Sequence, residues 1–301
     1  MKVAGGGGMM APASRHANLE KLLSAVVSWG MRKTPAADAP LAVLDDECSW
    51  AEPPRHLSLD TRELHVWRVS LNRGKRDLDR LLETLSPAER AQCGRFVKPE
   101  DGMRCVAARS ALRAILGSYL LKNPRTISIV KTPAGKPLLV GHESWLKDSV
   151  RGLHFSLTYA GNQACIAVCR GLRVGVDLEQ MRDVRGIAAI CRGFLCQEER
   201  SIVLSRTGED RIRAFFLAWT RREATSKALG VGLYDSFARY SLPAAPFSPG
   251  GFKVILDTAG WSSAPAGSWW IRDLVPGGGL SGALCIEKKN VDPSYFQLRD
   301  W

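Results

Sequence analysis

Arg173-Val-Gly-Val-Asp-Leu-Glu179 predicts a β-strand that carries two carboxylates in an otherwise apolar run. Because successive side chains of a strand point to opposite faces, Asp177 and Glu179 project from the same face. Two carboxylates so placed repel each other unless a cation lies between them. Mg²⁺ beside a nucleotide is usually held by one or two carboxylates together with phosphate oxygens. The alternative is a strand end in solvent, with Arg182 and Arg185 as surface partners.

A long helix is predicted from Asp210 to Leu229. Its buried stripe is formed, at 3.6-residue spacing, by Ile212, Phe215, Phe216 and Trp219. The same stripe, continued turn by turn, reaches Glu223 and then Lys227, so this charged pair prolongs the apolar face. An inward charge pair carries a desolvation cost that a fold seldom tolerates without a ligand, a metal or a reaction. The alternative is a helix that leaves the core after Ala224, with both groups in water.

The remaining segments predict an α+β fold of two similar halves. The expected elements are strand 64–71, helices 86–96 and 102–121, strands 127–130 and 163–169, helical pieces within 184–205, and strands 251–257, 268–273 and 282–287. The order of strand, helices and strands occurs twice, which favours halves at residues 62–172 and 173–301. Residues 1–61 open with a glycine run and contain Ala/Pro-rich pieces, which predicts a partly disordered N-terminal extension.

The chain has 301 residues and a formal net charge of +12, from 42 Lys and Arg against 30 Asp and Glu. Such an excess suits a polyanionic small ligand, an acidic protein partner or nucleic acid. Nucleic acid is disfavoured because the positive charges are scattered and no binding motif is present. Eight cysteines without C-x-x-C or zinc spacing predict reduced core thiols and a cytoplasmic protein. No apolar run approaches the ~20 residues of a membrane span.

Several basic and hydroxyl side chains are weaker candidates. Lys136 lies in a stiff Gly-Lys-Pro turn, where its cation is either fixed against phosphate or simply exposed. Arg109 and Arg113 are i,i+4 neighbours that either grip phosphates or cover the helix surface. Ser156 and Thr158 supply small hydroxyls, and both also fit as ordinary strand residues.

Together these segments resemble the surfactin-synthetase-activating type of 4′-phosphopantetheinyl transferase over about residues 62 to 290. That family carries a G-V/I-D-x-E block and, further along the chain, W-x-x-K-E-A/S-x-x-K-x-x-G-x-G-L. Here they read Gly175-Val-Asp-Leu-Glu179 and Trp219-Thr-Arg-Arg-Glu-Ala-Thr-Ser-Lys-Ala-Leu-Gly-Val-Gly-Leu233. The two signatures in this order and at this spacing are highly specific.

The resemblance implies a pseudo-dimer of two α+β halves, with coenzyme A and Mg²⁺, or Mn²⁺ in its place, in the cleft between them. Asp177, Glu179 and Glu223 would hold the metal against the coenzyme A pyrophosphate. Glu223 would also take the proton of a carrier-protein serine, and Lys227 would steady the departing 3′,5′-ADP. The implied reaction transfers 4′-phosphopantetheine to an apo acyl or peptidyl carrier protein of fatty-acid, polyketide or nonribosomal-peptide synthesis.

By the same resemblance, the coenzyme A contacts would be Lys136, Arg109, Arg113, Thr158, Tyr159, Arg90 and Arg95. Tyr159 stands where the family has a histidine, and Arg222 replaces a lysine before Glu223. Tyrosine donates a hydrogen bond but carries no positive charge, which motivates the alternative of a non-catalytic coenzyme A or nucleotide-binding protein. The intact carboxylate and lysine set favours the enzyme. An internally duplicated cleft predicts a monomer, with no nucleic-acid or membrane partner.

Overall fold

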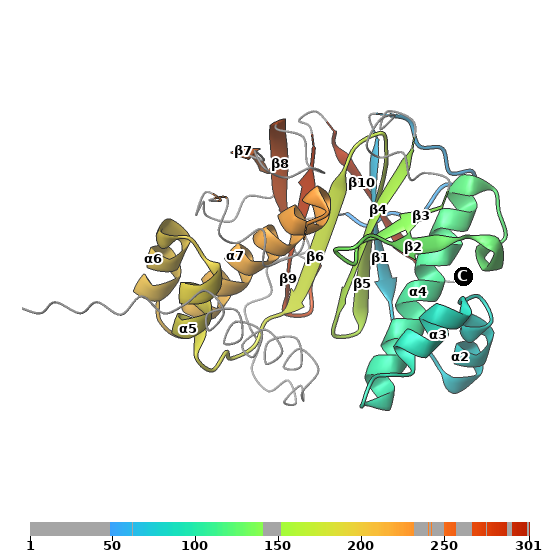
Figure 1. Ribbon diagram of the computed structural model, residues 1–301, viewed down its shortest axis with the longest axis horizontal. Coiled ribbons are helices and arrows are strands. Elements are labelled where there is room, and N and C mark those ends of the chain that lie inside the picture. Colours follow the sequence, from blue (N-terminus) through green and yellow to red (C-terminus); the bar gives the residue numbers. More distant parts are fainter. Residues whose placement is uncertain are drawn as a thin grey trace, which may run out of the picture. The chain divides into compact units, whose positions relative to one another are not determined.

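The computed structural model describes residues 49–61, 63–140, 152–231, 240, 242, 250–256, 267–274, 276–287, 291–299 and 301 (Figure 1). The first half contains β1 (Leu64–Ser70), α2 (Lys75–Leu82), α3 (Pro87–Cys93), α4 (Pro99–Leu120), the 3-10 helix η1 (Pro124–Thr126), β2 (Ile129–Lys131), β3 (Pro137–Leu139), β4 (Leu153–Ala160) and β5 (Gln163–Arg170). The second half contains β6 (Val174–Gln180), α5 (Ile187–Phe194), α6 (Gln197–Ser205), α7 (Gly208–Leu229), β7 (Phe252–Leu256), β8 (Gly267–Leu274) and β9 (Leu280–Ile286). The last strand is β10 (Pro293–Leu298). Across this part of the chain, no helix is long and apolar enough to cross a membrane.

The first half is a sheet in the order β10-β1-β5-β4, packed against α2, α3 and α4 (Figure 1). β1 shows why the sequence folds this way, because its side chains alternate between two cores. Trp67 and Val69 belong to the core under the helices, whereas Leu64 and Val66 belong to a second core on the opposite face of the sheet. α3 begins as predicted, since Ser86 and Glu89 form a capping box at its N-terminus.

The second half repeats this plan with a sheet in the order β6-β9-β8-β7 and α7 lying along β6 and β9 (Figure 1). Its own core joins Ala224 and Ala228 of α7 to Trp269 and Ile271 of β8. The prediction of an α+β fold with two halves is therefore confirmed, and each half has helices covering a sheet.

The two halves meet along β4 and β6, which belong to different sheets. The hydroxyl of Ser156 accepts a hydrogen bond from the Val176 amide at 3.1 Å, and that of Thr158 accepts one from the Leu178 amide at 3.2 Å. Side-chain hydroxyls thus satisfy β6 amides that have no strand partner on this side. The core behind them contains β1 and β5 side chains together with Val174, Val176 and Leu178.

Segments at both ends of the described chain contact the first half. Residues 49–61 are not a loose extension, since Ala51 bridges to Phe296 and Leu59 is buried in the first core. β10 pairs in parallel with β1, so the end of the chain belongs to the first sheet and not to the second half. The Ala51–Phe296 bridge and the β1–β10 pairing both join residues far apart in the chain. The alternation of polar and apolar residues in one segment does not specify such a distant partner strand. Residues 1–48 lie outside the described residues.

The expectation that every cysteine is a reduced thiol is wrong for Cys93 and Cys105, which form a disulfide between α3 and α4. Their separation of 12 residues matches no short cysteine motif, so no local pattern indicated this disulfide. Within the described residues, the cysteines outside any disulfide are Cys165, Cys169, Cys191, Cys196 and Cys285. The disulfide removes part of the basis for a cytoplasmic location, which stays a prediction.

Candidate active site

The site is built on an unusually close contact between α7 and β6. A Cβ atom at Gly175 would lie 2.0 Å from the carbonyl oxygen of Ala224 and 2.4 Å from the amide nitrogen of Ala228. Only glycine therefore lets the helix rest directly on the strand. This contact places the end of α7, with Glu223 and Lys227, against the part of β6 that carries Asp177 and Glu179.

Lys227 and Asp177 form the central ion pair. The Nζ atom of Lys227 is 2.6 Å from Oδ1 of Asp177 and 3.3 Å from the carbonyl oxygen of Val176. The hydroxyl of Thr158 donates a second hydrogen bond to the same Oδ1, at 3.2 Å. The other carboxylate oxygen of Asp177, Oδ2, is buried and has no hydrogen-bond partner. Lys227 thus points inward, as the helical stripe predicts, while one oxygen of its partner stays unsatisfied.

The positive charge beside Asp177, Glu179 and Glu223 is too small to neutralise all three carboxylates. Burial, with Asp177 as the next cause, raises the pKa of Glu179 to about 7, against the opposing effects of Arg182, Lys227 and a hydrogen bond from Trp219. Burial, with Asp177 and Glu179, likewise raises the pKa of Glu223 to about 8. Burial alone would lower the pKa of Lys227, but the surrounding carboxylates raise it. A cluster in which the pKa values of carboxyl groups are raised to near neutral pH is typical of a functional site.

The carboxylate oxygens of Asp177, Glu179 and Glu223 are the kind of donor that binds a divalent cation. Among the described residues, no three His, Cys, Asp or Glu side chains are gathered as a ready-made metal site. Mg²⁺ needs no such cage, since it commonly keeps several waters and binds one or two carboxylates plus substrate phosphates. The unsatisfied Oδ2 of Asp177 and the raised pKa values of Glu179 and Glu223 both show a deficit of positive charge here. The residues therefore fit a hard divalent cation that arrives with a phosphate ligand.

Two buried arginines hold α7 from either side, and sequence reasoning gave neither this role. Arg221 forms two hydrogen bonds with Asp273 of β8, at 2.8 and 2.6 Å. Arg222 pairs with Glu199 of α6, with its Nε 2.9 and 2.8 Å from the two carboxylate oxygens. Arg222, which the resemblance aligns with a lysine, is thus fully buried in a structural ion pair. No local signal indicated these pairs, because Asp273 is 52 residues from Arg221 and Glu199 is 23 residues from Arg222.

Lys136, Arg109 and Arg113 are engaged within the protein. Lys136 directs its Nζ at the carbonyl oxygens of Val174 and Ala228, at 3.4 Å each. Arg113 is buried, and it donates to Glu89 at 2.8 Å and to two carbonyl oxygens of the η1 segment. Arg109 donates to Gln92 at 3.0 Å and lies 3.6 Å from Glu89. These contacts give Arg113 a structural role, which its i,i+4 spacing from Arg109 did not distinguish from phosphate binding.

The other predicted coenzyme A contacts are divided between the inside and the surface. Thr158 is buried and serves Asp177 and the Leu178 amide. Tyr159 is partly buried, and burial raises its pKa while nearby Arg109 lowers it. Arg90 is exposed and donates to the carbonyl oxygens of Leu85 and Glu83, and Arg95 is exposed as well. The candidate residues thus fall into an inner carboxylate cluster, a pair formed by Arg109 and the nearby Tyr159, and the exposed Arg90 and Arg95.

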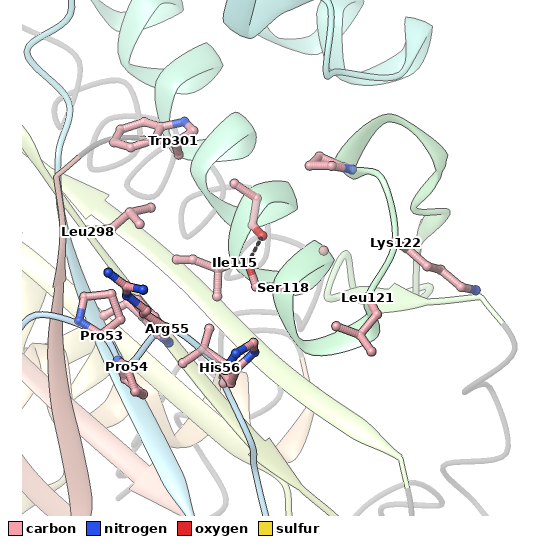
Figure 2. A pocket seen from close by; sticks show the side chains of 15 residues that line it. Pro53, Pro54, Arg55, His56, Ile115, Ser118, Leu121, Lys122, Leu298 and Trp301 are labelled. Carbon is pink, nitrogen blue, oxygen red and sulfur yellow. Dashed lines mark hydrogen bonds between the residues drawn. The ribbon is translucent and has the colours of Figure 1, made fainter.

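A separate cavity of about 750 Å³ lies on the first half, away from this cluster. It is lined by residues 53–57, the end of α4 and the C-terminal Leu298 and Trp301 (Figure 2). Ser118, which lines it, donates its hydroxyl to the carbonyl oxygen of Ala114 at 3.1 Å. No residue of the predicted site lines this cavity.

The fold and the inner cluster together are typical of an enzyme that catalyses phosphoryl-type transfer. Two α+β halves meet where buried carboxylates can bind a cation and accept a proton beside a lysine that can neutralise a phosphate. This is the set of groups that phosphoryl-type transfer requires.

Comparison with known proteins identifies the family within that class. Residues 173–265 match the model of the 4′-phosphopantetheinyl transferase superfamily, and residues 70–170 match the model of the N-terminal part of 4′-phosphopantetheinyl transferases. The chain is 30% identical to the 4′-phosphopantetheinyl transferase HetI of Nostoc sp. strain PCC 7120 over 248 residues, 82% of this chain and 98% of HetI. It is 24% identical to the 4′-phosphopantetheinyl transferase Sfp of Bacillus subtilis strain 168 over 163 residues, 53% of this chain and 68% of Sfp.

A human relative, named L-aminoadipate-semialdehyde dehydrogenase-phosphopantetheinyl transferase, is 24% identical over 173 residues, 56% of this chain and 55% of that protein. The HetI match spans nearly the whole of that protein, and the two family models together cover both halves of the fold. The chain therefore belongs to the 4′-phosphopantetheinyl transferase superfamily and is an enzyme of that family.

Proposed function

We propose that this enzyme transfers the 4′-phosphopantetheine moiety of coenzyme A to a serine of an apo acyl or peptidyl carrier protein, with Mg²⁺, and releases 3′,5′-ADP. The observation that supports it most directly is the inward Glu223 and Lys227 pair facing Asp177 and Glu179 across the α7–β6 contact. A protein that only binds coenzyme A has no need of a buried proton acceptor.

In the proposed reaction, the carrier serine oxygen forms a bond to the β-phosphorus of coenzyme A, and the bond from that phosphorus to 3′,5′-ADP breaks. Glu223 accepts the serine proton, directly or through water, and burial tunes it toward this task by raising its pKa to about 8. Lys227 neutralises charge on the departing phosphate. A divalent cation held by Asp177, Glu179 and Glu223 would supply charge neutralisation for the pyrophosphate.

For the nucleotide end of coenzyme A, we propose the outer basic group, which comprises Arg109, Tyr159 and the exposed Arg90 and Arg95. The side chain of Arg109 is 15% exposed and lies near Tyr159, so this pair is partly accessible to a ligand. Arg113 and Thr158 contribute indirectly, because one holds Glu89 beside Arg109 and the other holds Asp177. Lys136 is not part of this group, because its Nζ already contacts the carbonyl oxygens of Val174 and Ala228.

The net charge of +12 supports an acidic partner, because opposite charges steer diffusional encounter. Carrier proteins of the acyl and peptidyl type are such partners in this proposal. We also propose a monomer, since both halves of the site come from one chain. Sedimentation at several protein concentrations tests this point.

The first experiment is intact-mass measurement of an apo acyl or peptidyl carrier after incubation with the protein, coenzyme A and Mg²⁺. We expect a gain of about 340 Da, the mass of one covalently added phosphopantetheine phosphodiester, that disappears with EDTA. Glu223→Gln should abolish the gain while coenzyme A binding stays within about two-fold, and Glu198→Gln, on the exposed face of α6, should transfer normally.

The second candidate is a non-catalytic coenzyme A binding protein, which Tyr159 favours because it lacks the charge of histidine. Binding of coenzyme A without a mass gain on several carriers would establish that candidate. Full transfer by Glu223→Gln would instead refute the role of this residue and leave the reaction in place.

A further inference from the structure

Lys136 extends from a rigid turn of the first half. Between β2 and β3, the Thr132 amide donates to the Lys136 carbonyl at 2.8 Å, and the Lys136 amide donates to the Thr132 hydroxyl at 3.0 Å. Gly135 occupies the left-handed region with φ of 85°, which the turn requires. The base of the lysine side chain is therefore fixed relative to the first half.

Its ammonium group, however, contacts the second half at two points. Nζ lies 3.4 Å from the carbonyl oxygen of Val174, where β6 begins, and 3.4 Å from that of Ala228, in the last turn of α7. The last four carbonyls of a helix lack an intrahelical partner, and a cation beside them is stabilising. The aliphatic stem also covers the C-cap of α7, because a Cβ at Gly230 would lie 3.6 Å from Cδ of Lys136.

Few titratable groups surround this ammonium group. The titratable groups that face it are Arg173 and Glu287 and the thiols of Cys169 and Cys285. Burial, assisted by Arg173, lowers its pKa to about 8, and Cys169, Cys285 and Glu287 oppose this shift.

We propose that Lys136 is a positioning residue, which holds the end of α7 against the start of β6 and thereby sets the Lys227 to Asp177 contact. The contacts of its Nζ with the carbonyl oxygens of Val174 and Ala228 explain how it positions these elements. Val174 is three residues before Asp177, and Ala228 directly follows Lys227, so Lys136 bridges the two backbones that carry the catalytic cluster. This inference rests on the proposed function for its effect on catalysis.

The test compares Lys136→Met with Lys253→Met, which removes an exposed lysine from β7. For Lys136→Met we expect coenzyme A affinity, measured by calorimetry, to stay within two-fold of the wild type. Transfer kcat should fall at least ten-fold, and amide exchange of peptides covering residues 222–231 should become about ten-fold faster. Lys253→Met should change none of the three quantities.

Two outcomes overturn the proposal. A ten-fold loss of coenzyme A affinity with unchanged exchange would make Lys136 a phosphate ligand, and no change in any quantity would make it dispensable. If Lys136→Met does not fold, Lys136→Gln keeps a donor without the charge and should show a smaller change in the same direction. Exchange and affinity need no turnover, so a wild-type protein that transfers nothing refutes the proposed function alone.

Discussion

At the residue scale, the dominant feature is that Asp177, Glu179 and Glu223 share a single lysine. Because burial and its neighbours raise the folded-state pKa of Glu223 from 4.5 to about 8, folding disfavours its ionised form. The stability that this group gives the protein is complete below pH 4.5 and is lost as the pH rises toward 8. Neutralisation of this one side chain should therefore stabilise the metal-free protein at the upper end of that range.

We accordingly predict that Glu223→Gln raises the Tm of the protein in EDTA at pH 8.5 by at least about 2–4 °C, the shift that ~1 kcal/mol produces in a domain of this size. Well below pH 4.5 the two proteins should have the same Tm, because the glutamate is then largely protonated in both the folded and the unfolded state. Differential scanning fluorimetry across this pH range measures the difference. The exposed Glu198→Gln serves as control, and an equal Tm shift at both pH values would show that charge is not the cause.

Local periodicity predicted which side chains of the inner cluster share a face, but it did not predict the contacts of Arg113. Glu223 and Lys227 continue an apolar stripe, and the spacing of Asp177 and Glu179 fixes their common face, so local periodicity was sufficient. Arg113 was different, because its partners Glu89 and the η1 carbonyls are 24 and 11 to 14 residues away. Helical spacing shows which side chains share a face, but it does not show which distant acceptors that face meets.

At the scale of elements, the α7–β6 contact depends on Gly175. We predict that Gly175→Ala lowers Tm by at least about 4 °C and reduces transfer at least ten-fold. A Cβ at 2.0 Å from a helix carbonyl must push α7 away from β6, and overpacking of this kind costs roughly 1–3 kcal/mol or more. Thermal melting and the carrier mass assay measure the two effects together.

Gly193→Ala is the matched control, because this glycine lies within α5 and an added Cβ would meet no atom within 4 Å. There the exchange should raise stability by about 0.5–1 kcal/mol through helix propensity. A Gly175→Ala protein as stable and active as the wild type would mean that the helix tolerates a larger separation from the strand than the structure indicates.

At the scale of the whole molecule, the two halves are similar in plan but not independent. β10, from the end of the chain, pairs along β1 from Leu64 to Val69, and its Phe296 ring lies 5.1 Å from that of Trp67. Sequence periodicity identified most strands of both halves, but it did not predict the pairing of β10 with β1. A parallel pairing between residues more than 200 positions apart leaves no local pattern, since its partner strand is chosen by tertiary packing.

This crossing strand predicts how the molecule responds to truncation. Removal of residues 291–301 leaves β1 as an unpaired edge, uncovers Trp67 and removes Trp301 from Arg73. We expect the truncated chain to lose at least 10 °C of Tm or to aggregate, because an exposed apolar edge strand favours intermolecular pairing. If β10 is only an accessory strand, the truncated chain will instead melt within a few degrees of the full chain. The second half, which keeps β6 to β9, would then retain the carboxylate cluster. Carrier modification by the truncated chain would show that transfer does not require β10 in the first sheet.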